Sequence, residues 1–173
     1  MRTETLDLDH IAESCRELAD HLDGMPAADS DRDDGGDAVD MLSWLKPFAG
    51  CGTVGCISGH AVALFDSHLM AAEHFGRGNV AHRARELIGF PRHIQRGSVD
   101  EYAHTPEARR LDAVARALMH PPKTDYDQAE IDGGGCAVVL REIADNIRTI
   151  GGGGVEAVWR EVMESNGVLL DIH

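Results

Sequence analysis

The fold is organised by a stretch that reads CGTVGCISGHAVALF and occupies residues 51–65. Two cysteines, three glycines and one histidine lie within its first ten residues, and an apolar run follows directly. With Thr53 as the N-cap, the pattern predicts a helix that runs to about Phe75 and is closed by Gly76. A Gly/Ala-rich helix in the middle of the chain predicts a core built by close helix packing.

Most of the remaining chain also has apolar residues at helical spacing, and no strand pair with a turn signal is evident. At 173 residues with 43% apolar content, the chain is long enough for one core. It is therefore predicted to be a single all-α domain, residues 1–173, of about six or seven helices. The other expected helices are one over residues 6–22, a short one between Asp37 and Pro47, one capped by Asn79 and running to Ile88, one capped by Thr105 and ending at His120, one that follows Gly133 to Gly135, and a last one containing Val155 and Trp159.

Two segments are expected to interrupt the helices. Residues 27–37 contain no apolar residue larger than alanine and are predicted to form a mobile acidic loop. Gly151 to Gly154 are predicted to form a flexible break before the last helix. Gly89, by contrast, is a predicted helix stop, with Pro91 beyond it.

The charge of the chain is strongly negative and unevenly distributed. The formal net charge is −14; residues 1–50 carry 13 acidic against four basic side chains, whereas residues 77–116 carry eight arginines against five acidic side chains. This balance argues against nucleic-acid binding through the whole surface. It favours a cytoplasmic protein, or one that meets a basic partner.

Neither a membrane helix nor a secretory signal is expected. The chain has no apolar run of about 18 residues, and its first residues lack an apolar core. Four cysteines in such a protein are expected to be reduced thiols or ligands rather than disulfides; they are Cys15, Cys51, Cys56 and Cys136.

The Cys/Gly stretch offers one metal hypothesis. On a helix capped by Thr53, Cys56 and His60 share a face with Cβ atoms about 6 Å apart, and Cys51 could fold back over them. Zinc is the metal that such donors would take. The spacing is not that of the usual zinc motifs. A fourth ligand would have to come from Cys136, His120, His74 or water.

A second hypothesis makes Cys51 or Cys56 a catalytic nucleophile, because a helix N-terminus lowers a thiol pKa and can hold an oxyanion. Cys56 and His60 would lie on one helix and face inward, which favours Cys51. Along the helix, His60 would lie about 13 Å from Cys51. A distant base, His104 or His120, would therefore be needed.

A third hypothesis is an anion site made by the free N–H groups of residues 52–55. Arg83, Arg85 or Arg92 would supply the positive charge. The chain has no phosphate-loop lysine pattern to support it.

The interpretation that the sequence favours is structural. Gly55, Gly59 and Ala63 recur every four residues and would give the helix a smooth strip for close packing. Cys56 would then be a small buried hydrophobe, and His60 a core histidine bonded to a backbone carbonyl.

The motif also resembles a known group of proteins. It matches the signature C-G-T-x-x-C-x-[AS]-G-[HW]-A, carried by small proteins of bacteriophages and their actinobacterial or related hosts. Trp44, the Arg85–Phe90 segment and the Pro-containing turn before the late helix match more loosely, over roughly residues 40–150. The resemblance implies no particular activity. Because tryptophan can stand at the position of His60, it implies that His60 is not an obligatory ligand or base.

Together these observations favour a non-enzymatic phage- or prophage-type protein, located in the cytoplasm of the host cell, that binds a host or viral protein. The alternative is a thiol-dependent or metal-assisted enzyme centred on Cys51, Cys56 and His60. The oligomeric state is left open by the sequence.

Overall fold

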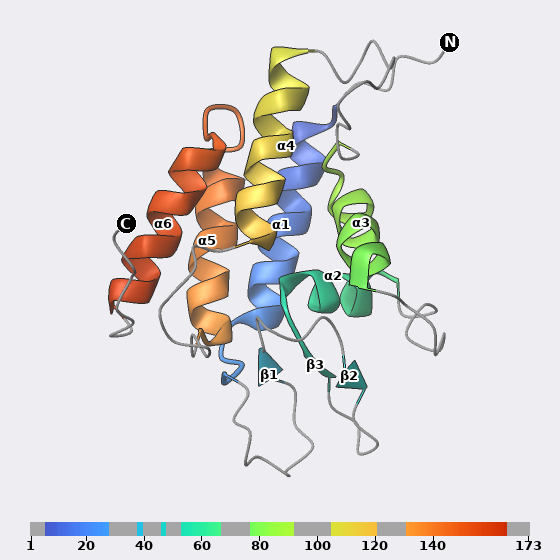
Figure 1. Cartoon of the computed structure of the whole chain (residues 1–173), viewed down its shortest axis with the longest axis vertical. Coiled ribbons are helices and arrows are strands. Elements are labelled where there is room, and N and C mark those ends of the chain that lie inside the picture. Colours follow the sequence, from blue (N-terminus) through green and yellow to red (C-terminus); the bar gives the residue numbers. More distant parts are fainter. Residues whose placement is uncertain are drawn as a thin grey trace.

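The computed structural model describes residues 6–27, 38–39, 46–47, 53–66, 77–91, 105–120 and 131–165. Buried apolar side chains from every helix in these ranges form one core, which confirms the predicted single all-α domain. The described elements, shown in Figure 1, are α1 (Leu8–Leu22), β1 (Ala38–Val39), β2 (Lys46–Pro47), β3 (Thr53–Gly55), α2 (Ile57–Phe65), α3 (Arg77–Ile88), α4 (Pro106–Met119), α5 (Gly133–Asp145) and α6 (Gly152–Ser165).

Helices α1 and α5 pack side by side in antiparallel orientation. At one end the N–H of Gly133 donates to the carbonyl of Met25 at 2.8 Å. At the other end Arg148 donates to the Asp9 carboxylate at 2.9 Å. The apolar face predicted for α1 is buried between these ends; its members are Ile11, Cys15, Leu18, Ala19 and Leu22.

The helix start predicted at Thr105 is confirmed by its capping bond. A similar bond shows that α5 begins at Gly133, three residues before the start predicted after Gly135. Thr105 accepts the N–H of Ala108 at 3.1 Å, with Pro106 at the first helical position. Asp132 accepts the N–H of Gly135 at 2.8 Å. Each cap satisfies a backbone donor that would otherwise lack a partner in the first turn, so these boundaries follow from local sequence.

Hydrogen bonds join α4 to α6 and to the turn between α5 and α6. The indole Nε1 of the fully buried Trp159 donates to the carbonyl of Ala117 at 3.0 Å. Arg110 donates to the carbonyls of Ile147 and Ile150, both at 2.7 Å. Trp159 therefore anchors α6 to α4 in the core, and Arg110 fixes the α5–α6 connection to α4.

The predicted stop at Gly89 is also confirmed, but the cap predicted at Asn79 is wrong, because α3 already begins at Arg77. Gly89 has φ +92, and its N–H donates to the carbonyl of Glu86 at 3.1 Å. The N–H of Phe90 donates to the carbonyl of Arg85 at 2.9 Å. This pair of bonds is the Schellman ending, and its positive φ favours glycine.

The start predicted for the Gly/Ala-rich helix is wrong. Thr53–Gly55 forms β3, which pairs in parallel with β1 and antiparallel with β2. Cys56 is the N-cap instead, with an extended backbone (φ −73, ψ 175), and α2 ends at Phe65. Gly55 therefore does not belong to the helix. Residues 67–76 of the predicted helix lie outside the described residues. Figure 1 places α2 at one end of the bundle, beside the sheet.

The short helix predicted between Asp37 and Pro47 is replaced at both ends by strands, β1 and β2. The residues between the two strands lie outside the described part of the chain. Strands of two residues carry no readable alternation of apolar and polar side chains, which is why the periodicity did not predict them.

The predicted glycine break is shorter than expected, because α6 already begins at Gly152. A Cβ atom there would lie 2.9 Å from the carbonyl oxygen of Ala113, so this glycine lets α6 approach the α4 backbone. The predicted acidic loop, apart from Ala27, lies outside the described residues. None of the helices in the described ranges is long and apolar enough to span a membrane.

Candidate functional site

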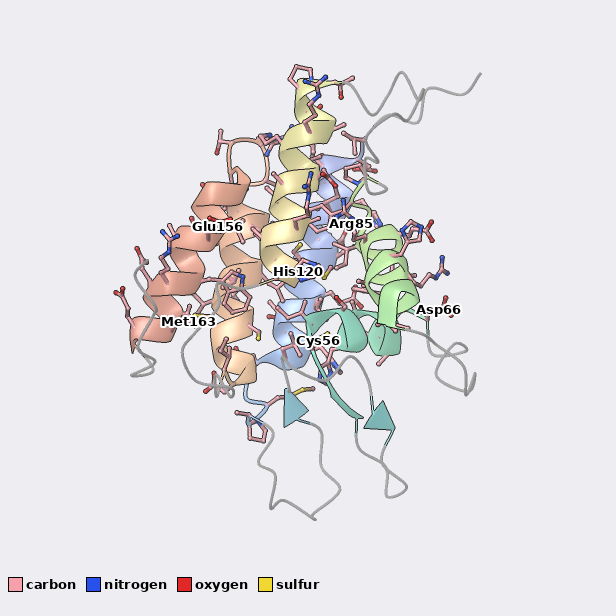
Figure 2. All side chains as sticks on the ribbon, viewed as in Figure 1. Cys56, Asp66, Arg85, His120, Glu156 and Met163 are labelled. Carbon is pink, nitrogen blue, oxygen red and sulfur yellow. The ribbon has the colours of Figure 1, made fainter. Side chains whose placement is uncertain are left out.

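The candidate site is the connection from β3 into α2, which carries Cys56 and His60, two of the predicted nucleophile or metal-ligand residues. The first six residues of α2, 57–62, are all buried. The side chains of residues 57–62 therefore face neighbouring helices rather than solvent, whereas residues 63–65 are partly exposed. Figure 2 shows Cys56 at the end of the bundle where α2 begins.

Cys56 lies at the N-terminus of α2, where a lowered thiol pKa was expected. The side chain is almost completely buried. Burial raises the pKa of the Cys56 thiol, and hydrogen bonding to the backbone of Gly59 and Ser58 offsets this only in part. Cys56 is therefore held as a neutral thiol at pH 7, and it is not an activated nucleophile.

His60 and Ser58 connect α2 to two neighbouring helices. His60 is completely buried, and its ring centroid lies 5.5 Å from that of His21 on α1, with the rings tilted by 56°. The Ser58 hydroxyl donates to the sulfur of Met119 on α4 at 2.7 Å. Both polar groups thus lie in contacts between helices. The burial predicted for His60 is confirmed, and its bond to a backbone carbonyl stays a prediction.

The other described cysteines are core residues. Cys15 on α1 and Cys136 on α5 are fully buried. Burial raises the pKa of the Cys15 thiol to about 12. Burial likewise raises the pKa of Cys136, and the nearby Asp132 and Cys56 raise it further. These thiols are small apolar packing groups at neutral pH.

The structure describes only some residues of the predicted metal set, namely Cys56, His60, Cys136 and His120. Cys51 lies outside the described residues, and so do His74 and His104. His120 is exposed at the C-cap of α4. Within the described ranges, no three His, Cys, Asp or Glu side chains are placed to hold a metal ion. A site that includes Cys51, and a catalytic role for Cys51, therefore stay predictions.

We expect Cys15, Cys56 and Cys136 to resist an aromatic disulfide reagent in the native protein at pH 8. At a pKa of about 12, roughly one Cys15 thiol in ten thousand is ionised at that pH. The buried thiols would then react only when the core opens transiently. The measurement is a thiol titration with and without denaturant.

The control for this titration is Cys51→Ser, which removes the fourth cysteine of the chain. We expect this variant to show no fast native reaction and three reactive thiols after unfolding. Rapid labelling of the folded variant would contradict the burial described here.

The sequence did not predict the most heavily desolvated charged cluster in the described structure. Asp112 on α4 is fully buried, and Arg85 on α3 is 6% exposed. Arg85 donates to Asp112 at 2.5 Å and to the carbonyl of Pro91 at 2.9 Å. Arg116, one turn beyond Asp112, donates to the other carboxylate oxygen. Figure 2 shows Arg85 between α3 and α4.

The opposite charges in this cluster favour the ionised forms of Asp112 and Arg85 against the effect of burial. Burial alone would raise the pKa of Asp112, but hydrogen bonds from Arg116 and Arg85 outweigh it and keep the pKa below its usual value. Burial lowers the pKa of Arg85, and Asp112 offsets part of this effect. A carboxylate held ionised between two guanidinium groups is a weak general base at neutral pH. The i,i+4 spacing of Asp112 and Arg116 is the signal that could have indicated the cluster.

The predicted anion site is not assembled from the arginines that the structure describes. Arg85 is engaged by Asp112. Arg83 forms ion pairs with Asp66 at 2.7 Å and Glu86 at 3.2 Å. These hydrogen bonds raise the pKa of Arg83. Both guanidinium groups thus connect elements of the fold, and Arg92 lies outside the described residues.

The fold and this site define an all-α domain whose described thiols and buried charges stabilise its interior. No protein-family model matches the chain, and neither a curated protein nor a solved structure matches it. The resemblance to the phage and actinobacterial proteins therefore stays a prediction.

Proposed function

We propose that this chain is a non-enzymatic, phage- or prophage-encoded protein that acts in the host cytoplasm by binding a host or viral protein. One observation carries the proposal. In the described structure, the groups best suited to chemistry are buried in helix contacts or in ion pairs; they are Cys15, Ser58, Cys56, His60, Arg85, Asp112 and Cys136. The exposed faces of the described helices are mostly charged, and such surfaces suit protein recognition rather than catalysis.

The charge of the surface supports a basic partner. Residues 6–27 and 131–165, which contain α1, α5 and α6, carry 12 carboxylates against four arginines. Several of these carboxylates lie on exposed positions of α1 and α6, such as Glu13, Glu17 and Glu164. A field of one sign raises the association rate with an oppositely charged partner and makes binding sensitive to salt.

The test is affinity capture of partners from the host lysate with the tagged full-length chain, at low and high salt. We expect a protein that is retained at low salt and released as ionic strength rises. Glu17→Lys on α1 is expected to weaken capture several-fold. Glu107→Lys, an equivalent exposed change on α4, is expected to have less effect. Absence of any captured protein, together with turnover of a small substrate, would refute the proposal.

The alternative, a thiol-dependent or metal-assisted enzyme, now depends on Cys51. Elemental analysis of the purified protein by mass spectrometry tests it. One equivalent of zinc that is lost in Cys51→Ser would favour a metal centre over a binding protein.

A further inference from the structure

A hollow of about 370 Å³ lies between α1 and the end of α5. Asp9, Ala12 and Arg16 line it from α1, and residues 144–149 line it from the opposite side. It is open to solvent, and two of its floor residues, Ala12 and Ala144, are small. Larger side chains at these two positions would fill the space that the hollow occupies.

Two ion pairs bound the hollow, and they cross between the same two segments. Arg16 on α1 donates to Asp145 at 3.0 Å, and Arg148 donates back to Asp9 on α1 at 2.9 Å. Asp9 and Arg16 are seven residues apart on one helix, which separates the two pairs by about 10 Å along the axis. The hollow therefore presents a positive and a negative group at each end.

These ion pairs can rearrange to bind a charged ligand with little loss of protein stability. Their side chains are 52% to 86% exposed, and exposed pairs contribute little to stability. Each guanidinium has five N–H donors. Among the described residues, Arg16 uses its donors on Asp145 and on the carbonyl of Ala144, and Arg148 uses its donors on Asp9. Donors and carboxylate lone pairs thus remain to receive a second partner.

The lining favours a charged peptide over a compact small molecule. Small-molecule sites are mostly apolar and enclose their ligand, whereas this hollow is open and edged by two arginines and two aspartates. Because those four charges cancel, an occupant with one basic and one acidic group complements it better than a polyanion or polycation. In a polyproline-II segment, residues i and i+3 lie on one side about 9 Å apart, which matches the separation of the ion pairs.

We propose that this hollow binds an extended segment of the partner protein that carries a basic and an acidic residue three positions apart. The proposal rests on the protein-binding function proposed above. Partner and hollow exchange ion pairs: the partner's acid takes donors of one arginine, and its base takes the aspartate at the opposite end.

The test is titration of the ¹⁵N-labelled full chain with capped tetrapeptides, followed by amide chemical shifts. The probes are Arg-Pro-Pro-Asp and Asp-Pro-Pro-Arg; Arg-Pro-Pro-Arg and Asp-Pro-Pro-Asp are the charge controls. We expect shifts confined to residues 9–16 and 144–149 with a mixed-charge peptide, and at least about tenfold weaker binding of both controls. Equal binding of all four peptides, or no shift at millimolar concentration, would overturn the proposal.

Two variants connect the shifts to the hollow. Ala12→Met fills its floor and is expected to abolish the shifts; Glu13→Met, one residue along on the exposed face of α1, is expected to preserve them. Arg148→Ala, on an exposed position, repeats the test without a change in packing. Shifts that persist in both Ala12→Met and Arg148→Ala would place the peptide elsewhere and refute the site.

The two proposals fail in different ways. If a partner is captured from the lysate equally well by the Arg148→Ala chain and by the unchanged chain, the protein-binding function stands and the hollow is not its site. If the mixed-charge peptides bind the hollow while no partner is captured and a small substrate is turned over, the protein-binding function fails and the hollow remains a peptide site without an assigned partner.

Discussion

Replacing Gly133 by alanine is expected to lower the free energy of unfolding by about 3 kcal/mol, the upper part of the range for overpacked sites. A Cβ atom at this position would lie 1.9 Å from the carbonyl oxygen of Leu22 and 2.9 Å from the Cβ atom of Met25. The obstacle is mostly backbone, which cannot rotate away as a long side chain can. The N–H of Gly133 also donates to the carbonyl of Met25 at 2.8 Å, so any shift that relieves the clash strains this bond.

The matched control is Gly134→Ala, one residue along the same helix. The nearest atom to a Cβ there is 3.5 Å away, on the side chain of Asp132. Alanine is the better helix former by about 1 kcal/mol, so this variant is expected to be slightly more stable than the unchanged chain. Urea unfolding followed by circular dichroism measures both. Equal stability of the two variants would show that α5 does not start against the end of α1 as described.

Asp112→Asn is expected to destabilise the protein by about 3 to 5 kcal/mol, the cost of leaving one partner of a buried ion pair without its counter-charge. Arg85 is 6% exposed and has Asp112 as its acidic partner in the described structure. The amide oxygen of asparagine can still accept hydrogen bonds, but the amide carries no charge. Arg85 would keep its charge in a poorly solvated place, with Arg116 close by.

Two comparisons separate this cause from simple loss of packing. The double replacement Arg85→Met with Asp112→Leu removes both charges and is expected to recover most of the lost stability, because apolar residues of similar volume often replace buried ion pairs without cost. Asp145→Asn, which removes an exposed partner of Arg16, is expected to cost less than about 1 kcal/mol. A double variant as unstable as Asp112→Asn would contradict the electrostatic explanation.

The same cluster sets an expected dependence on pH. The folded pKa of Asp112 is lower than its usual value. Its contribution is therefore complete above the unfolded pKa of about 4 and is lost as the pH falls through the folded pKa. Acid unfolding of the unchanged chain should include this loss, and Asp112→Asn should lack it. Unfolding curves between pH 5 and pH 2 measure the difference.

The sequence by itself determined the start of α4 and the ends of α1, α3 and α4. The cap at Thr105 and the stop at Gly89 act within a few residues, so their effect is readable without knowing the fold. The apolar spacing of α1 and α5 likewise predicted which faces are buried, because a helix has a fixed period.

Only the tertiary structure decided what happens at the Cys/Gly stretch and at the charged cluster. Thr53–Gly55 becomes a strand because two separate segments before it, β1 and β2, supply its hydrogen-bond partners, and this moves the cap of α2 to Cys56. Burial then raises the thiol pKa of Cys56 and encloses Arg85 with Asp112. Strand pairing and desolvation depend on residues far apart in the chain. The local pattern therefore identified the side chains that could take part in catalysis or binding, and the packing around them determined which are accessible and reactive.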